Sequence, residues 1–416
     1  MGPELTLILA IGLGLYMAFG IGANDVANAI GTSVGSKALT VKKAIIMAAI
    51  LEFLGAFLVG GHVTKTVRGG ILDPIISSSA PELMVYGMMA ALMAAGTWLM
   101  VASRFGWPVS TTHSIVGAIA GFGIVAFGTS VVQWDQLIKI VSSWIISPLF
   151  SGTLAFLIYS FIRWTILRHS DAAQKTRKWA PLYIFSVVVV IALVTLFKGL
   201  KNLNLDLTLV ESLIWSGILG LCAVISGHYL IAKIKPDSPK KSIDTSQNSI
   251  VEKMFGVLQI MSACAVAFAH GSNDVANAIG PLAAIVHIGS TGIVDAQSPV
   301  PSWLLLLGGF GIVIGLATMG YRVMGTIGTK ITKLTPSRGY AAEFAAALTI
   351  VIASRLGLPI STTHTLVGGV MGVGLTQGIK GLDLKMISKI GISWLVTVPA
   401  GAILAIIFFY TLKYLF

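Results

Sequence analysis

The chain has 416 residues, of which 55% are hydrophobic and only 11% are charged, and its mean hydropathy is +0.89. Soluble domains carry about a quarter charged residues, so this composition excludes a water-soluble globular protein and predicts a membrane-embedded chain. The formal net charge of +12 does not indicate nucleic-acid binding, because the basic residues fall in short loops between apolar stretches, where they set orientation in the membrane.

Apolar stretches long enough to cross or enter a bilayer recur along the whole chain. There are twelve of them: Leu5–Gly31, Ala44–Val63, Leu83–Ser103, Phe105–Phe127, Leu137–Ile162, Pro181–Phe197, Leu209–Ala232, Met254–Ala284, Trp303–Met324, Tyr340–Ser354, Leu356–Gln377 and Ile387–Leu412. We therefore predict an all-α polytopic membrane protein with about twelve membrane segments. The first stretch has no basic region before it, so we expect it to be kept as a span and not cleaved as a signal peptide.

The first stretch ends in a polar motif, GANDVANAIG, in which Asn24, Asp25 and Asn28 are spaced i, i+1, i+4. On a helix this spacing places the two amides one turn apart with the carboxylate beside them. A carboxylate inside a span costs about 2.5–3.5 kcal/mol on insertion scales, so such residues usually bind something. Glycines around the motif would let the helix unwind and turn carbonyl oxygens toward a cation, and this oxygen set suits sodium. A polar cluster that only packs helices together is the alternative.

The fourth stretch contains a second polar motif, SRFGWPVSTTHSIVG, which Pro108 interrupts. Four polar side chains follow the proline: Ser110, Thr111, Thr112 and His113. Proline followed by Ser and Thr is typical of a helix start, so we predict broken helices or re-entrant hairpins at these segments. A helix N-terminus offers free N–H groups to an anion, and the hydroxyls add donors. Hydroxyls that bond their own helix carbonyls are the alternative.

Both motifs recur after a polar connection, from Lys233 to Lys253, that we interpret as a flexible cytoplasmic linker. GSNDVANAIG matches the first motif at nine of ten positions, and SRLGLPISTTHTLVG matches the second at ten of fifteen, at offsets of 249 and 251 residues. The corresponding polar side chains are Asn273, Asp274, Asn277, Ser361, Thr362, Thr363 and His364.

An odd number of apolar stretches separates the starts of the two copies, so the second copy enters the membrane from the opposite side. Such an inverted repeat indicates an alternating-access transporter with its site near the midplane. We divide the chain into a first repeat (1–165), connecting helices and linker (166–253, with the linker at 233–253) and a second repeat (254–416). Most of the 28 lysines and arginines fall in alternate loops, which predicts a plasma-membrane protein with both termini outside the cytoplasm.

The intramembrane carboxylates also bear on which anion is bound. Phosphate keeps at least one proton at neutral pH and sulfate does not, so Asp25 and Asp274 could accept that hydrogen bond and disfavour sulfate. Glu52 and Glu343 lie in otherwise apolar surroundings, where either a role in ion or proton coupling or a structural partner would explain them. The same two alternatives hold for His113 and His364.

The duplicated NDVANA signature, with PVSTTHSIVG and PISTTHTLVG behind it, closely resembles the inorganic phosphate transporter (PiT) family, which includes sodium-phosphate symporters of animals. The resemblance covers both halves. It implies transport of inorganic phosphate driven by a sodium or proton gradient, with sodium as co-substrate, no other cofactor, and a homodimer in the lipid bilayer. The linker is short compared with the long loop of the animal members, so regulation through it is not implied.

Carried over position by position, the resemblance places the functional side chains of the family in both copies. Phosphate contacts fall on Asp25, Ser110, Thr111, Thr112, Asp274, Ser361, Thr362 and Thr363. Sodium contacts fall on Asn24, Asp25, Asn28, Asn273, Asp274 and Asn277. Glu52 and Glu343 occupy positions where the family also has glutamates.

Four alternatives remain open at this point. A proton-coupled carrier of phosphate or metal phosphate and a sulfate permease keep the transport class, and a passive channel would not accumulate substrate. The alternative from another class is an intramembrane lipid phosphatase with Ser110 or Ser361 as nucleophile. The symmetry of the motifs disfavours an enzyme, because an active site assigns different roles to unlike residues.

Overall fold

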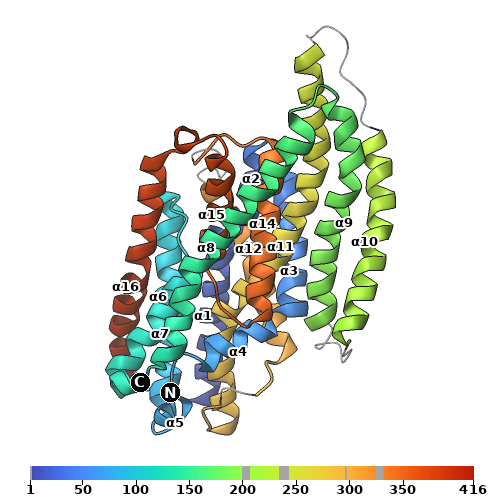
Figure 1. Cartoon of the computed structure of the whole chain (residues 1–416). Helices are drawn as coiled ribbons and strands as arrows, with labels where there is room; N and C mark the ends of the chain where they lie inside the picture. Colours follow the sequence, from blue (N-terminus) through green and yellow to red (C-terminus); the bar gives the residue numbers. More distant parts are fainter. Residues whose placement is uncertain (1, 199–206, 234–242, 296–297, 325–330) are drawn as a thin grey trace.

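A computed structural model describes residues 2–198, 207–233, 243–295, 298–324 and 331–416, apart from a few side chains within helices, among them that of Asn28. The described chain is helical almost throughout (Figure 1). Its α-helices are α1 (Pro3–Asn24), α2 (Val26–Gly35), α3 (Val41–Val59), α4 (Gly61–Gly69), α5 (Pro74–Ser77), α6 (Pro81–Phe105), α7 (Thr111–Phe127), α8 (Trp134–Ile162), α9 (Ala172–Lys198), α10 (Leu209–Ala232), α11 (Ile243–Thr291), α12 (Ser302–Met319), α14 (Pro336–Arg355), α15 (Thr362–Leu375) and α16 (Leu384–Leu415). Residues 234–242 of the predicted linker lie outside the described residues.

The helices have the lengths and compositions of membrane spans. Eight of the described helical segments are long and apolar enough to cross a bilayer. Helix α3 and the end of α4 form a pair bent by 68°, the geometry of either a broken span or a re-entrant loop. Each of the twelve apolar stretches overlaps a helix; the first covers the pair α1 and α2, and the second extends from α3 into α4. The protein is therefore an all-helical multi-pass membrane protein, while the count of twelve crossings stays a prediction.

The direction of the helices confirms that the two motif copies are inverted. Both termini lie at one end of the helix bundle, and the connections α2–α3, α8–α9 and α15–α16 lie at the other (Figure 1). Helix α1 runs away from the end that holds the termini, whereas α11 runs toward it. The two NDVANA segments are thus antiparallel.

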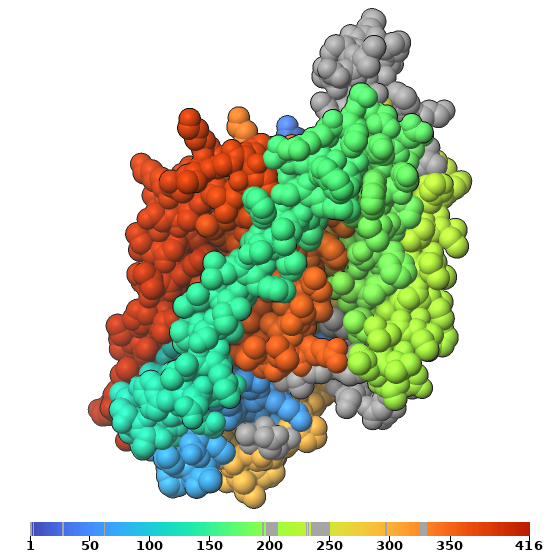
Figure 2. All heavy atoms as spheres, viewed as in Figure 1, coloured from blue at the N-terminus to red at the C-terminus, as the bar shows by residue number. Residues whose placement is uncertain are grey.

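Helix packing follows the same two-fold relation. Helix α7 packs against α16, and its counterpart α15 packs against α8; likewise α1 packs on α6 and α11 on α14. Helix α8 lies diagonally across one face of the molecule, over α14 (Figure 2). The pair α9 and α10 stands at the edge of the bundle, with α10 packed on α9 (Figure 1).

The glycines near the two motifs serve close packing, and the unwinding expected around the motifs was wrong for the second copy and is limited to a break at Asp25 in the first. Helices α1 and α2 are interrupted only at Asp25, whose backbone stays right-handed helical, and α11 runs unbroken through the second copy. A Cβ on Gly22 would overlap the backbone of Ile312, and one on Gly271 would overlap the backbone of Glu52. Small residues are needed where helices approach this closely in a membrane, which explains both glycines.

Candidate functional site: two opposed hairpin tips and a pair of carboxylates

Each STTH segment begins a helix inside the molecule, as the sequence predicts. Helix α6 ends before Gly106, which adopts a left-handed conformation (φ 65°), and Gly357 does the same after α14 (φ 70°). In this conformation a glycine ends a helix without strain from a Cβ. The chain then turns back and restarts at Ser110 and Ser361, whose Oγ atoms accept hydrogen bonds from the backbone N–H groups of the residues three positions on, at 3.2 and 3.1 Å. The result is two helical hairpins with buried tips.

The asparagine before the aspartate in the first motif holds the loop of the first hairpin. Asn24 Nδ2 donates to Ser103 Oγ at 3.1 Å and to the Trp107 carbonyl at 3.0 Å. Asn24 Oδ1 accepts from the Val109 N–H at 3.3 Å. Both polar atoms of the side chain therefore position the loop that leads into Ser110.

The second copy repeats this arrangement with one difference. Asn273 Nδ2 donates to Ser354 Oγ at 2.9 Å and to the Leu358 carbonyl at 3.3 Å. Asn273 Oδ1, by contrast, is buried and accepts no hydrogen bond from the described residues. This oxygen is free to face a ligand, whereas its counterpart on Asn24 is already engaged.

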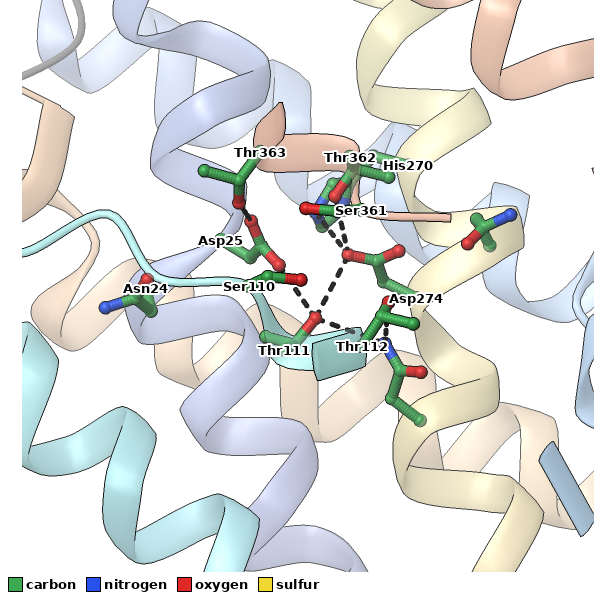
Figure 3. A network of polar contacts seen from close by, with 12 residues as sticks. Asn24, Asp25, Ser110, Thr111, Thr112, His270, Asp274, Ser361, Thr362 and Thr363 are labelled. Atoms are coloured by element: carbon green, nitrogen blue, oxygen red, sulfur yellow. Dashed lines mark hydrogen bonds and ion pairs between the residues drawn. The ribbon is translucent and has the colours of Figure 1, made fainter. Parts of the chain in front are cut away.

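The two carboxylates meet the two tips at one buried point (Figure 3). Thr111 of the first tip donates to Asp25 Oδ2 at 2.7 Å and lies 3.4 Å from Asp274 Oδ2. Thr362 of the second tip donates to Asp274 Oδ2 at 2.8 Å, and Thr363 donates to Asp25 Oδ1. All five side chains are almost completely buried. Residues more than 300 positions apart in the chain thus share one network.

The tips also contact each other across the two-fold relation. Thr112 of the first tip donates to the carbonyl of Ile360, just before the second tip, at 3.0 Å. In the equivalent contact, Thr363 Oγ1 of the second tip lies 3.3 Å from the carbonyl of Val109, just before the first tip. Asn277 Nδ2 lies 3.1 Å from both Thr111 Oγ1 and Thr112 Oγ1. The side chain of Asn28, the equivalent residue of the first motif, lies outside the described residues.

Several buried oxygens of α11 lack a donor, which is the arrangement that a cation stabilises. Asp274 Oδ1 and Asn277 Oδ1, together with Asn273 Oδ1, accept no hydrogen bond in the described part of the chain. A buried acceptor without a partner costs about 1–3 kcal/mol, and a cation bound nearby would remove that cost. Hard oxygen atoms of carboxylates and amides are suitable ligands for such an ion.

His270 is a site residue that the sequence reasoning missed. Its Nδ1 lies 2.8 Å from Glu52 Oε2, and its Nε2 lies 3.1 Å from Asp274 Oδ2. The side-chain ligand atoms of Asp25, His270 and Asp274 all lie within 4.8 Å of one another. An intramembrane histidine four residues before an aspartate shares its helix face, and this spacing was the signal available in the sequence. Glu52 is therefore joined to the central site through His270.

Glu343 lies in a separate polar cluster. Its Oε1 accepts from Thr32 and Ser33 of α2, each at 2.6 Å, and from Gln259 Nε2 at 3.0 Å. Its Oε2 accepts from Ser262 at 2.7 Å. These contacts join the α2 part of the first repeat to α11 and α14 of the second, toward the end of the molecule opposite the termini (Figure 1).

This cluster has no polar counterpart in the other copy. By the offsets of the motifs, the positions equivalent to Glu343, Gln259 and Ser33 carry buried apolar residues: Leu92, Ala10 and Leu282. The repeats therefore match at the hairpin tips but differ next to them. Glu343 joins its neighbouring helices by hydrogen bonds, whereas the equivalent residue Leu92 packs among apolar side chains.

The histidines of the STTH motifs do not join the carboxylate network. His113 stacks on Trp144 with ring centroids 3.7 Å apart, and His364 stacks on Trp394 at 3.5 Å. The two imidazoles also meet each other edge to face at 4.3 Å. A coupling role for them stays a prediction.

The fold and the site define a polytopic helical membrane transporter built from two inverted copies of a helical hairpin unit. Residues 21–405 match the model of the phosphate transporter family, and the chain belongs to this family. Family membership makes the protein a transporter and not an enzyme, which rules against the lipid phosphatase.

Three comparisons show how far the similarity extends. A putative phosphate permease of Haemophilus influenzae is 47% identical over 417 residues, covering 100% of this chain and 98% of the relative. The chloroplastic inorganic phosphate transporter 2-1 of Arabidopsis thaliana is 46% identical, covering 95% of this chain and 70% of the relative. A solved structure described as the sodium-dependent phosphate transporter superposes with a TM-score of 0.91 at 40% identity, covering 99% of this chain and 100% of the other.

Proposed function

We propose that this protein is a secondary active transporter that takes up inorganic phosphate together with sodium by alternating access. The observation that carries the proposal is the meeting of both hairpin tips and both aspartates at one buried point. Backbone N–H groups and hydroxyls at two helix N-termini suit a phosphate anion, and the carboxylates suit its proton and a cation.

The hydrogen bonds at the site support an order of binding in which sodium precedes phosphate. The hydroxyls of Thr111, Thr362 and Thr363 donate to the aspartates, so they are not yet available to an anion. Sodium at the carboxylates offsets their negative charge and competes for their oxygens. The hydroxyls then turn to phosphate, which bridges the two tips. The two repeats rock around the bound ions, as inverted-repeat transporters do.

The sodium ligands in this proposal come mainly from α11. The oxygens without donors on Asn273, Asp274 and Asn277 are the strongest candidates, with Asp25 opposite them. Asn24 contributes by positioning the first hairpin, and Oδ1 of Asn24 would have to release Val109 to bind an ion. The role predicted for Asn28 stays a prediction.

The test is uptake of labelled phosphate by the purified protein in liposomes, under an inward sodium gradient, an inward proton gradient or neither. We expect accumulation with sodium alone, lost when choline replaces sodium at constant pH. Accumulation with protons alone would leave phosphate as the substrate but make the proton the coupling ion, with Glu52, Glu343 or the histidines as its binding residues. Uptake of sulfate in place of phosphate, or equilibration without accumulation, would contradict the proposal.

Asp25→Asn is the residue-level test of the same proposal. The amide keeps the shape of the side chain but removes the charge that attracts sodium and turns an N–H₂ group toward threonine donors. We expect coupled uptake to be abolished while the protein stays folded, as judged by gel filtration in detergent. Asp135→Asn, in the exposed first turn of α8, is the matched control and should transport normally. Normal uptake by Asp25→Asn would refute the assignment.

The remaining sequence predictions belong to this proposal. We propose that the protein is a homodimer in the plasma membrane with both termini outside, divided into the repeats 1–165 and 254–416 and the connecting part 166–253. Both termini lie at one end of the bundle, which supports their being on the same side of the membrane; that this side is the outside rests on the distribution of basic residues (Figure 1).

A further inference from the structure

A large cavity lies behind the hairpin tips, on the side away from the aspartates. It has a volume of about 960 Å³ and is lined by α8, α15 and α16 together with His113 of α7. Successive residues on a helix are about 100° apart, so His113 points away from the face that carries Thr111, and His364 points away from Thr362. The cavity therefore touches the helices whose tips form the proposed phosphate site, but it is not part of that site.

The cavity lies near the middle of the membrane. Pro148 and Pro399 line it, and each stands at the midpoint of a long span, α8 and α16. None of its lining residues is charged, and most are apolar. A polar or charged occupant would find few complementary groups here: the two imidazoles, the Thr153 hydroxyl and the indole N–H of Trp394.

The mouth of the cavity is continuous with the surface that faces lipid. Leu149 of α8 and Leu395 of α16 both line it, and they are 66% and 79% exposed. Because both helices are membrane spans, exposed leucines at mid-span face hydrocarbon and not water. Figure 2 shows α8 as a diagonal ridge with the C-terminal helices beside it.

We propose that this cavity binds a hydrocarbon chain of a membrane lipid, which enters between α8 and α16. Water is excluded because so few polar groups line the cavity, and ordered water needs two to four partners. An empty space of this size would deprive its wall of dispersion contacts. Hydrocarbon is the one phase adjacent to the mouth, and the volume lies within the range of about 300–1,000 Å³ that is usual for ligand sites.

The bound chain would pack against the two histidine–tryptophan stacks, so fluorescence can detect it. The protein is reconstituted in phosphatidylcholine with brominated acyl chains or with ordinary ones, because bromine quenches tryptophan on contact. The chain has nine tryptophans, and two of them, Trp144 and Trp394, line the cavity. The emission of each is obtained as the difference between the wild type and the variant W144F or W394F. The variant W215F gives in the same way the emission of Trp215, which is exposed on α10 and serves as the reference for lipid contact.

We expect brominated chains to quench the emission of Trp144 and Trp394 at least about two-fold, as they quench that of Trp215. Gly391→Leu provides the second measurement, because Gly391 lines the cavity and has no atom within 4 Å of an added Cβ. The leucine side chain should occupy the part of the cavity next to Trp394, which lies one turn further along α16, and should lower the quenching of Trp394. Gly217→Leu on α10 is the matched control, also with open space at its Cβ, and should leave that quenching unchanged.

Two outcomes would overturn the proposal. Emission of Trp144 and Trp394 that is insensitive to brominated chains in the wild type would show that hydrocarbon does not enter. A disulfide between two copies of the Leu395→Cys variant, identified by mass spectrometry together with such insensitivity, would show that a second copy of the chain closes the mouth. Neither readout involves phosphate or sodium, so failure here and failure of the proposed function are separate results.

Discussion

Thr363 joins the two repeats at the level of a single hydroxyl. It belongs to the second hairpin, donates to Asp25 of the first motif and lies beside the Val109 carbonyl of the first tip. Thr111 makes the reverse connection, since it lies within reach of both aspartates. In the sequence the threonines are equivalent members of a repeated motif. The structure distinguishes them by the aspartate to which each hydroxyl donates a hydrogen bond.

Thr363→Val should lower phosphate uptake by about five- to a hundredfold. Valine keeps the shape of the side chain but removes the hydroxyl that donates to Asp25 and, in the proposed mechanism, then to phosphate. Loss of a buried hydrogen bond costs about 1–3 kcal/mol, and 1.4 kcal/mol corresponds to a factor of ten. Initial rates in liposomes under a sodium gradient give the measurement. Thr363→Ser keeps the hydroxyl and should retain most of the activity; equal activity in the valine variant would show that the hydroxyl does not matter.

Glu343 should contribute to stability through its charge. Four donors converge on its two oxygens, and a neutral glutamine would turn an N–H₂ group toward some of them. We expect Glu343→Gln to lower the free energy of unfolding by about 1.5–3 kcal/mol, the range of hydrogen bonds to charged groups. Thermal unfolding of the purified protein in detergent measures it, with exposed Glu82→Gln as the control. An unchanged melting temperature would mean that the carboxylate is not needed to hold α2 against α11 and α14.

At the scale of elements, the breaks before the STTH segments were predicted correctly, whereas the break expected at the second NDVANA motif was not found. The helix starts at Ser110 and Ser361 followed from local chemistry, because a proline and a capping hydroxyl act within a few residues of each other. The expected unwinding around the NDVANA motifs was wrong for α11, because the glycines there contact neighbouring helices that the local sequence does not reveal.

Helix α11 offers a matched pair of glycines that tests this packing. Gly271→Ala would place a methyl group against the backbone of Glu52 on α3, whereas Gly256→Ala on the same helix meets nothing within 4 Å. Overpacking of a tight interface costs about 1–3 kcal/mol, so we expect Gly271→Ala to lower the melting temperature and phosphate uptake. Gly256→Ala should be neutral or slightly stabilising, because alanine favours helix by about 1 kcal/mol over glycine. Equal behaviour of the two variants would refute the packing argument.

At the scale of the whole molecule, the distribution of basic residues predicts which end faces the cytoplasm. The loops at the end opposite the termini carry Lys37 and Lys380 among others (Figure 1). A protease-sensitive tag fused after Phe416 should therefore be removed by protease added to intact cells. Cleavage only after lysis would place the termini inside and reverse the proposed orientation.

The sequence by itself determined the class of fold, the inverted duplication and most of the side chains that meet at the site. These follow from hydropathy, motif repetition and the cost of a carboxylate in a membrane, which are all properties of short stretches of chain. Only the tertiary structure decided the contacts between these side chains. Asp25 accepts hydrogen bonds from both hairpins, and His270 links Glu52 to Asp274. Glu343 lies in a polar cluster with no counterpart in the other repeat. These contacts join residues far apart in the chain, and the packing of whole helices, which no local pattern encodes, brings them together.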